Sequence, residues 1–204
     1  MSAQLLRVQN FGVSRDGYGA GEGQSAQTPF GHADPASIFA WAGATASWPN
    51  RTEPGGSRGL DDYFTRDFHH NIGAEIMGRR KFGPQQGPWE DESWRGWWGE
   101  EPPYHAPVFV LTHHPRDPVE MAGGTTFHFV TDGFDAAYAA ASEAAGSQGV
   151  DIAGGAATAA AGMPVRAVCL GAEGCAWMAL ETAEGGSAVG RLDEDGALDV
   201  LWRF

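Results

Sequence analysis

The chain is poor in cysteine, in positive charge and in long hydrophobic runs. Its two cysteines, Cys169 and Cys175, are spaced neither as a Cys-x-x-Cys redox motif nor as a zinc site. A disulfide-stabilised secreted scaffold is therefore excluded, and we expect both thiols to be reduced. No apolar run is long enough for a signal peptide or a membrane-spanning helix. These absences predict a soluble, cytoplasmic protein with no membrane partner.

Positive charge is scarce, because 13 Lys and Arg residues face 26 Asp and Glu residues and give a formal net charge of −13. A surface that tracks nucleic-acid phosphates needs many cations, so DNA and RNA are not expected as partners. A small anionic ligand needs only one local basic spot and remains compatible. Four of the seven histidines occur as adjacent pairs, 69–70 and 113–114, whose rings point apart on a regular element, so no metal site is expected.

The composition is otherwise that of a folded domain, with 42% hydrophobic and 11% aromatic residues in 204 residues. Helices are expected from Asp34, an N-cap followed by Pro35, from Leu60, and over residues 134–145. Strands are expected at residues 5–13, 74–77, 108–112, 127–130 and 150–153. This alternation predicts an α/β fold with parallel crossover connections.

The C-terminal part follows a different pattern. Glycine-rich and acidic turns separate four segments, at residues 165–170, 176–183, 187–192 and 197–204. Their spacing of about ten residues predicts an antiparallel meander. In the last segment, alternation places one apolar set on a single face: Leu198, Val200, Trp202 and Phe204.

Two clusters carry most of the functional information. Residues 79–81 are three consecutive cations that follow a predicted strand and Gly78, where guanidinium groups can grip phosphate oxygens. A solvated basic turn explains them equally well. Gly154 and Gly155 separate a predicted strand from a predicted alanine-rich helix, so their backbone N–H groups can approach a pyrophosphate at the helix N-terminus or form a tight turn.

Two other patterns have competing interpretations. Ser57 lies in a Gly-x-Ser-x-Gly string that is typical of a hydrolase nucleophile, but the strand-turn-helix context of that motif is missing. The loop at residues 83–107 contains four tryptophans: Trp89, Trp94, Trp97 and Trp98. They form either a lid on a planar ligand or a plug over the sheet or a subunit interface. We favour the plug, because large aromatics more often supply buried area.

The order of the clusters resembles the dihydrofolate reductase superfamily, and more closely bacterial proteins similar to the C-terminal reductase domain of the bifunctional riboflavin biosynthesis enzyme. The likeness covers about residues 4–158 and lies in the motifs at 13–18, 76–82, 83–98, 108–115, 124–130 and 152–156. It implies a single domain over residues 1–204 with a dihydrofolate reductase-like three-layer α/β fold. The central sheet is expected to be mostly parallel, with an antiparallel C-terminal part, and residues 159–204 are atypical.

The resemblance also implies a function. The protein would bind NADPH and transfer a hydride to a small heterocyclic substrate, pteridine- or pyrimidine-like, or to an imine or carbonyl. A homodimer is common in the riboflavin-type branch. The implied cofactor residues are Val13, Ser14, Asp16 and Gly17 beside the nicotinamide, Gly78, Arg79, Arg80 and Lys81 at the phosphates, Thr112 and His113 on the adenosine side with its 2′-phosphate, and Gly154, Gly155, Ala156 and Ala157 under the pyrophosphate.

The proton donor and the C-terminal part depart from the family pattern. Asp61 and Asp62 fall near the acidic residue of folate reductases, offset by a position or two, and are the candidate catalytic acids. Charge at a helix N-terminus explains them as well. After residue 158 the likeness ends, either because the last strands were replaced or because an upstream change altered the reading of the coding region. A catalytically silent nucleotide-binding protein is therefore the alternative function.

Overall fold

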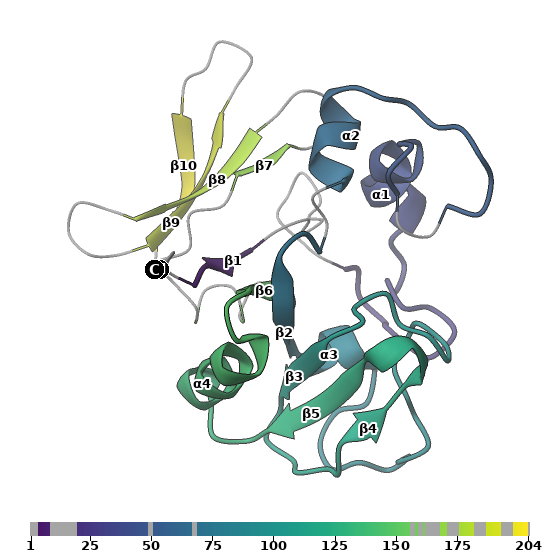
Figure 1. Cartoon of the computed structure of the whole chain (residues 1–204), viewed down its shortest axis with the longest axis vertical. Helices are drawn as coiled ribbons and strands as arrows, with labels where there is room; N and C mark the ends of the chain where they lie inside the picture. Colours follow the sequence, from purple (N-terminus) through teal and green to yellow (C-terminus); the bar gives the residue numbers. More distant parts are fainter. Residues whose placement is uncertain are drawn as a thin grey trace.

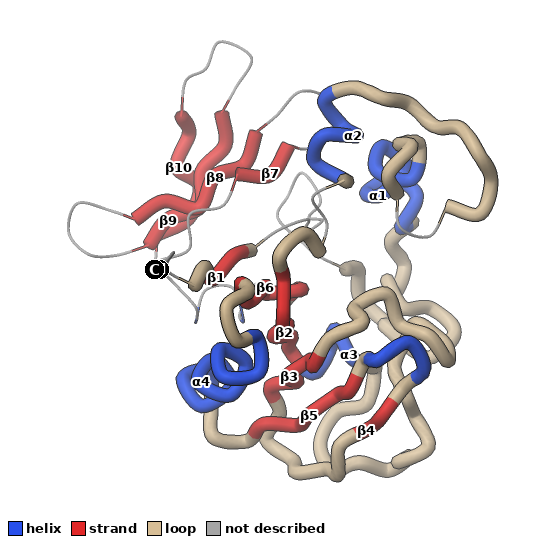
Figure 2. The backbone as a smooth tube through the Cα atoms, viewed as in Figure 1, coloured by secondary structure: helices blue, strands red, loops and turns tan. Residues whose placement is uncertain are grey.

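A six-stranded sheet forms the centre of the chain, as Figures 1 and 2 show. The computed structural model describes residues 4–8, 20–48, 51–66, 69–155, 158 and 161, and the backbone of four strands between 168 and 203. The order along the sheet is β1-β6-β2-β3-β5-β4. The strands are β1 (Leu6–Arg7), β2 (Ile72–Gly78), β3 (Pro107–Leu111), β4 (Val119–Glu120), β5 (Thr126–Val130) and β6 (Gly149–Gly154).

Within this sheet β4 pairs antiparallel to β5, and every other described pairing is parallel. The helices are α1 (Pro35–Gly43), α2 (Leu60–Thr65), α3 (Arg79–Phe82) and α4 (Phe134–Ala145), with a 3-10 turn η1 (Ala122–Gly124). The expected α/β architecture is confirmed. Because the strands are parallel, their carboxyl ends meet at one edge, where α3 and the segment after β6 begin.

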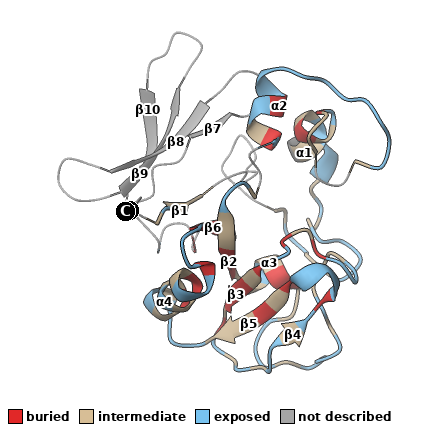
Figure 3. Cartoon of the chain, viewed as in Figure 1, coloured by how far each residue is buried: buried red, intermediate tan, exposed pale blue. Residues whose placement is uncertain are grey.

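Helix α4 covers one face of the sheet, and Figure 3 shows the buried residues between them. Ala74, Ile76 and Val150 point to this face and are 0% exposed. They meet Ala137 and Ala141, which are one helical turn apart on α4. Small side chains on the helix let it approach the strands closely. The helix predicted at residues 134–145 is confirmed at both ends.

The opposite face carries both charged and apolar side chains. The strand register aligns one row of residues across five strands: Arg7, Asp151, Glu75, Val108 and Phe127. Residues paired in this way project from the same side of a sheet. The row therefore starts with three charged residues on β1, β6 and β2 and ends with two apolar residues on β3 and β5.

The tryptophan-rich loop covers the apolar part of this face. Phe82, fully buried, meets Phe127 edge to face at a ring distance of 5.0 Å. Trp98 stacks on Phe127 at 5.9 Å, and Trp89 lies 5.2 Å from Phe129. These contacts agree with the plug, in which the aromatic rings bury apolar area of the sheet.

Helices α1 and α2 are held together by threonines. Asp34 caps α1 as predicted, since its carboxylate accepts the Ala36 N–H at 2.9 Å. The Thr45 hydroxyl after α1 bonds the Thr65 hydroxyl of α2 at 2.8 Å. Between the helices, Ser57 forms an isolated bridge with Thr45 instead of a strand-turn-helix elbow. The structural context of a hydrolase nucleophile is therefore missing at Ser57.

Two strands differ from the expectations. The strand predicted at residues 5–13 is observed only as β1, and residues 9–19 lie outside the described part. Strand β4 was not predicted, because two residues provide no periodicity to detect. No helix in the described part of the chain is long and apolar enough to cross a membrane.

The C-terminal segments form a sheet of their own. The strands β7 (Val168–Leu170), β8 (Ala176–Glu181), β9 (Ser187–Leu192) and β10 (Leu198–Arg203) pair antiparallel in the order β10-β9-β8-β7. The predicted meander is confirmed. The predicted alternation in its last strand is interrupted, because the register with β9 shifts between Val200 and Trp202. Phe204 lies outside the described residues.

Candidate functional site

The first candidate residue, Arg79, lies at the carboxyl edge of the sheet, directly after β2. Its guanidinium carbon is 3.6 Å from the centre of the Trp89 ring. Its Nη1 donates to the Thr112 hydroxyl at 3.3 Å. Two segments that the sequence analysis assigned to the same phosphate-bearing ligand, after β2 and after β3, are therefore in contact.

A second guanidinium, Arg116, lies against the same tryptophan, with its Cζ 5.0 Å from the Trp89 ring. Burial first, and repulsion from Arg116 second, lower the pKa of Arg79. In the described part of the chain, Nε and Nη2 of Arg79 and Nη1 of Arg116 are buried without a hydrogen-bond acceptor. Two neighbouring cations with unmatched donors suit an anion. Sequence reasoning missed Arg116.

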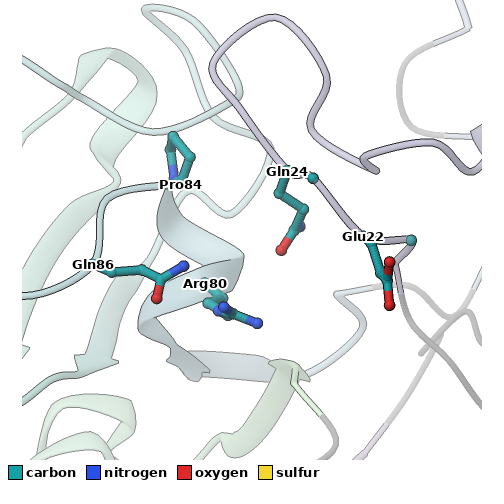
Figure 4. Close-up of a pocket in the computed structure, with 7 residues that line it drawn as sticks. Glu22, Gln24, Arg80, Pro84 and Gln86 are labelled. Atoms are coloured by element: carbon teal, nitrogen blue, oxygen red, sulfur yellow. The ribbon is translucent and has the colours of Figure 1, made fainter.

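The three consecutive cations of α3 lie in different surroundings. Arg80 lines a cavity of about 270 Å³. Figure 4 shows Glu22 and Gln24 on one wall of this cavity, and Arg80, Pro84 and Gln86 on the other. The three side chains separate because successive residues of a helix point in directions about 100° apart.

Lys81 takes a third direction and meets the glycine pair after β6. A Cβ placed on Gly154 would lie 3.4 Å from the Cδ of Lys81. A Cβ on Gly155 would lie 3.2 Å from the Thr158 hydroxyl and 3.8 Å from the Gly78 nitrogen. Both glycines have positive φ, +148° and +96°, a backbone that other residues rarely adopt. The segments after β2 and β6 therefore lie side by side.

A buried polar cluster lies on the face opposite α4, and sequence reasoning missed it. Glu75 is 1% exposed, and its carboxylate bonds Nδ1 of His69 at 3.0 Å. Burial raises the pKa of Glu75, although His69 and Lys81 oppose this effect. Burial, then Glu75 and Asp151, raise the pKa of Tyr104 well above its usual value. The available signal was an acidic residue inside an apolar strand.

The candidate acids Asp61 and Asp62 lie on α2, which Figure 1 shows beside α1 and apart from α3. Asp61 is exposed, whereas Asp62 is 7% exposed and accepts the Ser47 N–H at 2.7 Å. Burial raises the pKa of Asp62, but hydrogen bonds from Ser47 and the nearby Arg58 and Arg66 outweigh it and leave the pKa below its usual value. The Asp62 carboxylate is thus ionised at neutral pH and accepts a hydrogen bond from the Ser47 N–H.

The remaining predicted residues divide into two groups. His113 is exposed directly after Thr112 at the carboxyl edge of the sheet. The others lie outside the described residues: Val13, Ser14, Asp16, Gly17, Ala156 and Ala157. The structure therefore brings together Gly78, Arg79, Lys81, Thr112, Gly154 and Gly155, with Arg80 facing the adjoining cavity.

No protein-family model matches the chain, and no curated protein is similar to it.

Proposed function

We propose that the protein is an NADPH-dependent reductase with a dihydrofolate reductase-like fold, acting on a small heterocyclic substrate, pteridine- or pyrimidine-like, or on an imine or carbonyl. The observation that carries this proposal is the convergence at one sheet edge. Arg79 meets Thr112, and Gly154 and Gly155 meet Lys81 and Gly78. Three separate segments with the chemistry of a dinucleotide site thus meet where parallel sheets bind their ligands.

The residues present fit the phosphates of the cofactor. The buried N–H groups of Arg79 and Arg116 that lack acceptors in the described structure offer charge-assisted bonds to a phosphate monoester. The glycine pair has no side chains of its own, and a Cβ would make a tight contact with Thr158 at Gly155 and an ordinary contact with Lys81 at Gly154. In this arrangement Arg79 and Thr112 would hold the 2′-phosphate, and the backbone of Gly154 and Gly155 would hold the pyrophosphate.

The positions of these residues indicate which steps the cofactor supplies and which the protein supplies. When bound, NADPH supplies a hydride to an electrophilic carbon. The chain must orient the two reactants, exclude water and provide one proton. Arg79 orients the adenosine end, since its guanidinium is fixed between the Trp89 ring and the Thr112 hydroxyl. Rigid placement of this kind limits the entropy lost on binding.

A titration with NADPH and NADH tests this proposal. Wild-type protein is expected to prefer NADPH, and Arg79→Ala to weaken NADPH by about 10- to 150-fold, the equivalent of about 1.5–3 kcal/mol for a charged hydrogen bond. NADH, which lacks the 2′-phosphate, should be affected much less. The matched control is Arg95→Ala, which removes an exposed arginine that bonds the Glu120 carbonyl on β4. Equal weakening of both cofactors would contradict the placement of Arg79.

A silent nucleotide-binding protein is the second candidate. The observation that favours it is the position of Asp61 and Asp62 on α2, with the Asp62 carboxylate engaged by Ser47. Neither carboxylate is then available as the proton donor. Tight NADPH binding without oxidation in the presence of pteridine, pyrimidine and imine acceptors would support this alternative.

A further inference from the structure

The cavity of about 270 Å³ adjoins the proposed cofactor edge, because the helix α3 that carries Arg79 also supplies part of its lining. Arg80, Pro84 and Gln86 form one wall, and the loop at residues 21–24 forms the other (Figure 4). The cavity is smaller than the roughly 300–1,000 Å³ typical of sites for drug-sized ligands. It therefore suits a small ligand.

Two opposite charges line this cavity. Figure 4 shows the Arg80 guanidinium and the Glu22 carboxylate on opposite walls. In the part of the chain that the structure describes, neither side chain forms a hydrogen bond or an ion pair. A plain anion would be attracted by Arg80 and repelled by Glu22. A ligand that carries one charge of each sign would satisfy both side chains at once.

The wall that carries Glu22 is fixed by its own hydrogen bonds. The Glu22 N–H donates to Nδ1 of His32 at 3.0 Å, and the Glu22 carbonyl accepts the His32 N–H at 3.0 Å. Gly31 has a φ of +62°, and a Cβ there would collide with the Glu22 carbonyl oxygen. Gln24 Nε2 donates to the Pro29 carbonyl at 2.7 Å. The backbone of this wall is thus set before a ligand binds, which limits the entropy lost on binding.

The opposite wall is held by the tryptophan-rich loop. Trp94 Nε1 donates to the carbonyl of Phe82, the last residue of α3, at 3.0 Å. A Cβ on Gly83 would collide with the same tryptophan ring. Arg80 is therefore presented from a fixed helix, one residue after Arg79. The cavity and the proposed phosphate site share α3, which suits a substrate that must be held against the cofactor.

We propose that this cavity binds the substrate of the reduction, and that the substrate is a small cyclic imino acid whose carboxylate meets Arg80 and whose protonated imine nitrogen meets Glu22. The proposal rests on the proposed function and selects the imine among its substrate classes. A guanidinium can bind a carboxylate through two parallel bonds, which orients the ring. The zwitterion has no net charge, so the net charge of −13 of the chain does not repel it.

An iminium substrate also supplies the proton of the reaction. The iminium carbon accepts a hydride, which oxidises NADPH to NADP⁺, and the π pair of the C=N bond becomes the lone pair of the nitrogen. The product is a neutral amine that takes its next proton from water. The Glu22 carboxylate favours the protonated imine, which is more electrophilic than the neutral form. The reduction then needs neither Asp61 nor Asp62 as a proton donor.

Binding of the reduction product tests the cavity without turnover. Free proline and its six-membered-ring homologue carry the expected carboxylate and ring ammonium, and calorimetry measures their Kd with and without NADP⁺. Arg80→Gln and Glu22→Gln should each raise this Kd by about 10- to 150-fold, as expected for a lost charged hydrogen bond. The matched controls are Arg95→Gln and Glu53→Gln, at exposed residues outside the cavity, and should keep the wild-type Kd. Failure of both amino acids to bind, or an unchanged Kd in both cavity variants, would overturn the proposal.

Turnover tests the role of each charge. Wild-type protein should reduce a cyclic imine with a carboxylate on the imine carbon with a kcat/KM about tenfold or more above that of its methyl ester. Arg80→Gln should remove this preference by raising KM for the acid and not for the ester. Glu22→Gln should lower kcat/KM for both, because both react as iminium ions. Faster reduction of a pteridine or a pyrimidine than of the imino acid would contradict the assignment.

The outcomes separate the two proposals. If NADPH does not bind, the proposed function fails and the substrate assignment fails with it. If NADPH binds and the cavity variants change neither product binding nor turnover, the substrate assignment is wrong and the cofactor site stands. If NADPH binds and no acceptor is reduced, the substrate assignment is also wrong, and the silent binder is supported.

Discussion

At the scale of single residues, α3 shows how one run of cations serves three environments. Arg79 lies on Trp89, Arg80 lines the cavity with Glu22, and the stem of Lys81 lies against Gly154. The positive charge that the sequence concentrates in three positions is thus distributed around the carboxyl end of β2. One ligand phosphate can meet Arg79 without engaging Lys81, so the contributions of the two side chains can be tested separately by substitution.

His128 gives a prediction on stability against pH. Its ring stacks on Phe109 at 5.1 Å, and partial burial lowers the pKa of His128 below 6.5. The folded state therefore binds fewer protons at His128 than the unfolded state between its lowered pKa and 6.5. Its contribution to stability is full above pH 6.5 and decreases as the pH falls through that window.

We expect His128→Gln to remove this part of the acid dependence. The measurement is the free energy of unfolding by urea from pH 8 to pH 5, for wild type and variant. The difference in the free energy of unfolding between wild type and His128→Gln should become smaller as the pH falls. His113→Gln, at an exposed histidine, is the control and should leave the wild-type slope intact. A parallel offset of the His128→Gln curve at every pH would contradict the assignment.

At the scale of elements, the tryptophan-rich loop is fixed by specific hydrogen bonds as well as by apolar packing. Trp94 Nε1 donates to the Phe82 carbonyl at 3.0 Å, and Trp89 Nε1 donates to the His114 carbonyl at 3.0 Å. Arg116 Nη2 donates to the Trp94 carbonyl at 2.7 Å. Arg116 thus contributes both to the loop and to the Arg79 site, so the plug and the candidate cofactor site share a residue.

Gly83 tests the fit of this loop. Its φ of −174° is extended, so alanine meets no backbone strain there, but its Cβ would collide with Nε1 of Trp94. We expect Gly83→Ala to lower the free energy of unfolding by about 1–3 kcal/mol, as overpacking in a core does. The matched control is Gly59→Ala, also extended at φ −178°, with nothing within 4 Å of the added Cβ. Equal free energies of unfolding for the two variants would show that the tryptophan-rich loop moves to accommodate the added methyl group.

The elements that sequence could predict are those with their own periodic or capping signals. Asp34 and Pro35 mark the start of α1, and the alanine pattern marks α4 from Phe134. β4 has two residues and depends on its neighbour β5. The C-terminal strands form a sheet of their own instead of extending the central sheet. The sequence could not predict this, because the residue pattern of a strand does not specify which strand it pairs with.

The candidate site was predictable only in part, for a related reason. The convergence of residues after β2, β3 and β6 follows from the parallel arrangement, which the alternation of elements implies. Side-chain directions do not follow from it, so the different surroundings of Arg79 and Arg80 were not predicted. Glu75 and Asp151 were missed because the register that pairs them across β2 and β6 is a property of the assembled sheet.

At the scale of the whole molecule, the chain contains two described sheets with different organisation. The residues proposed to bind NADPH that the structure describes all belong to the six-stranded sheet and its loops. The strands β7–β10 pair only with one another among the described strands. The resemblance predicted from the sequence ends at about residue 158, between the last strand of the six-stranded sheet and the first strand of the second sheet.

A chain that ends at Val165, before β7, tests whether the second sheet contributes to the site. Since no described strand of that sheet pairs with β1–β6, we expect the shortened chain to keep its Kd for NADPH within about threefold, or about 0.7 kcal/mol. Bound cofactor should also raise its Tm, because a ligand at 100 times its Kd stabilises the folded state by about 2.7 kcal/mol. Loss of both effects in a shortened chain that retains the circular dichroism of an α/β protein would mean that the C-terminal residues complete the cofactor site. In that case the sequence after residue 158 would itself determine whether the protein binds NADPH.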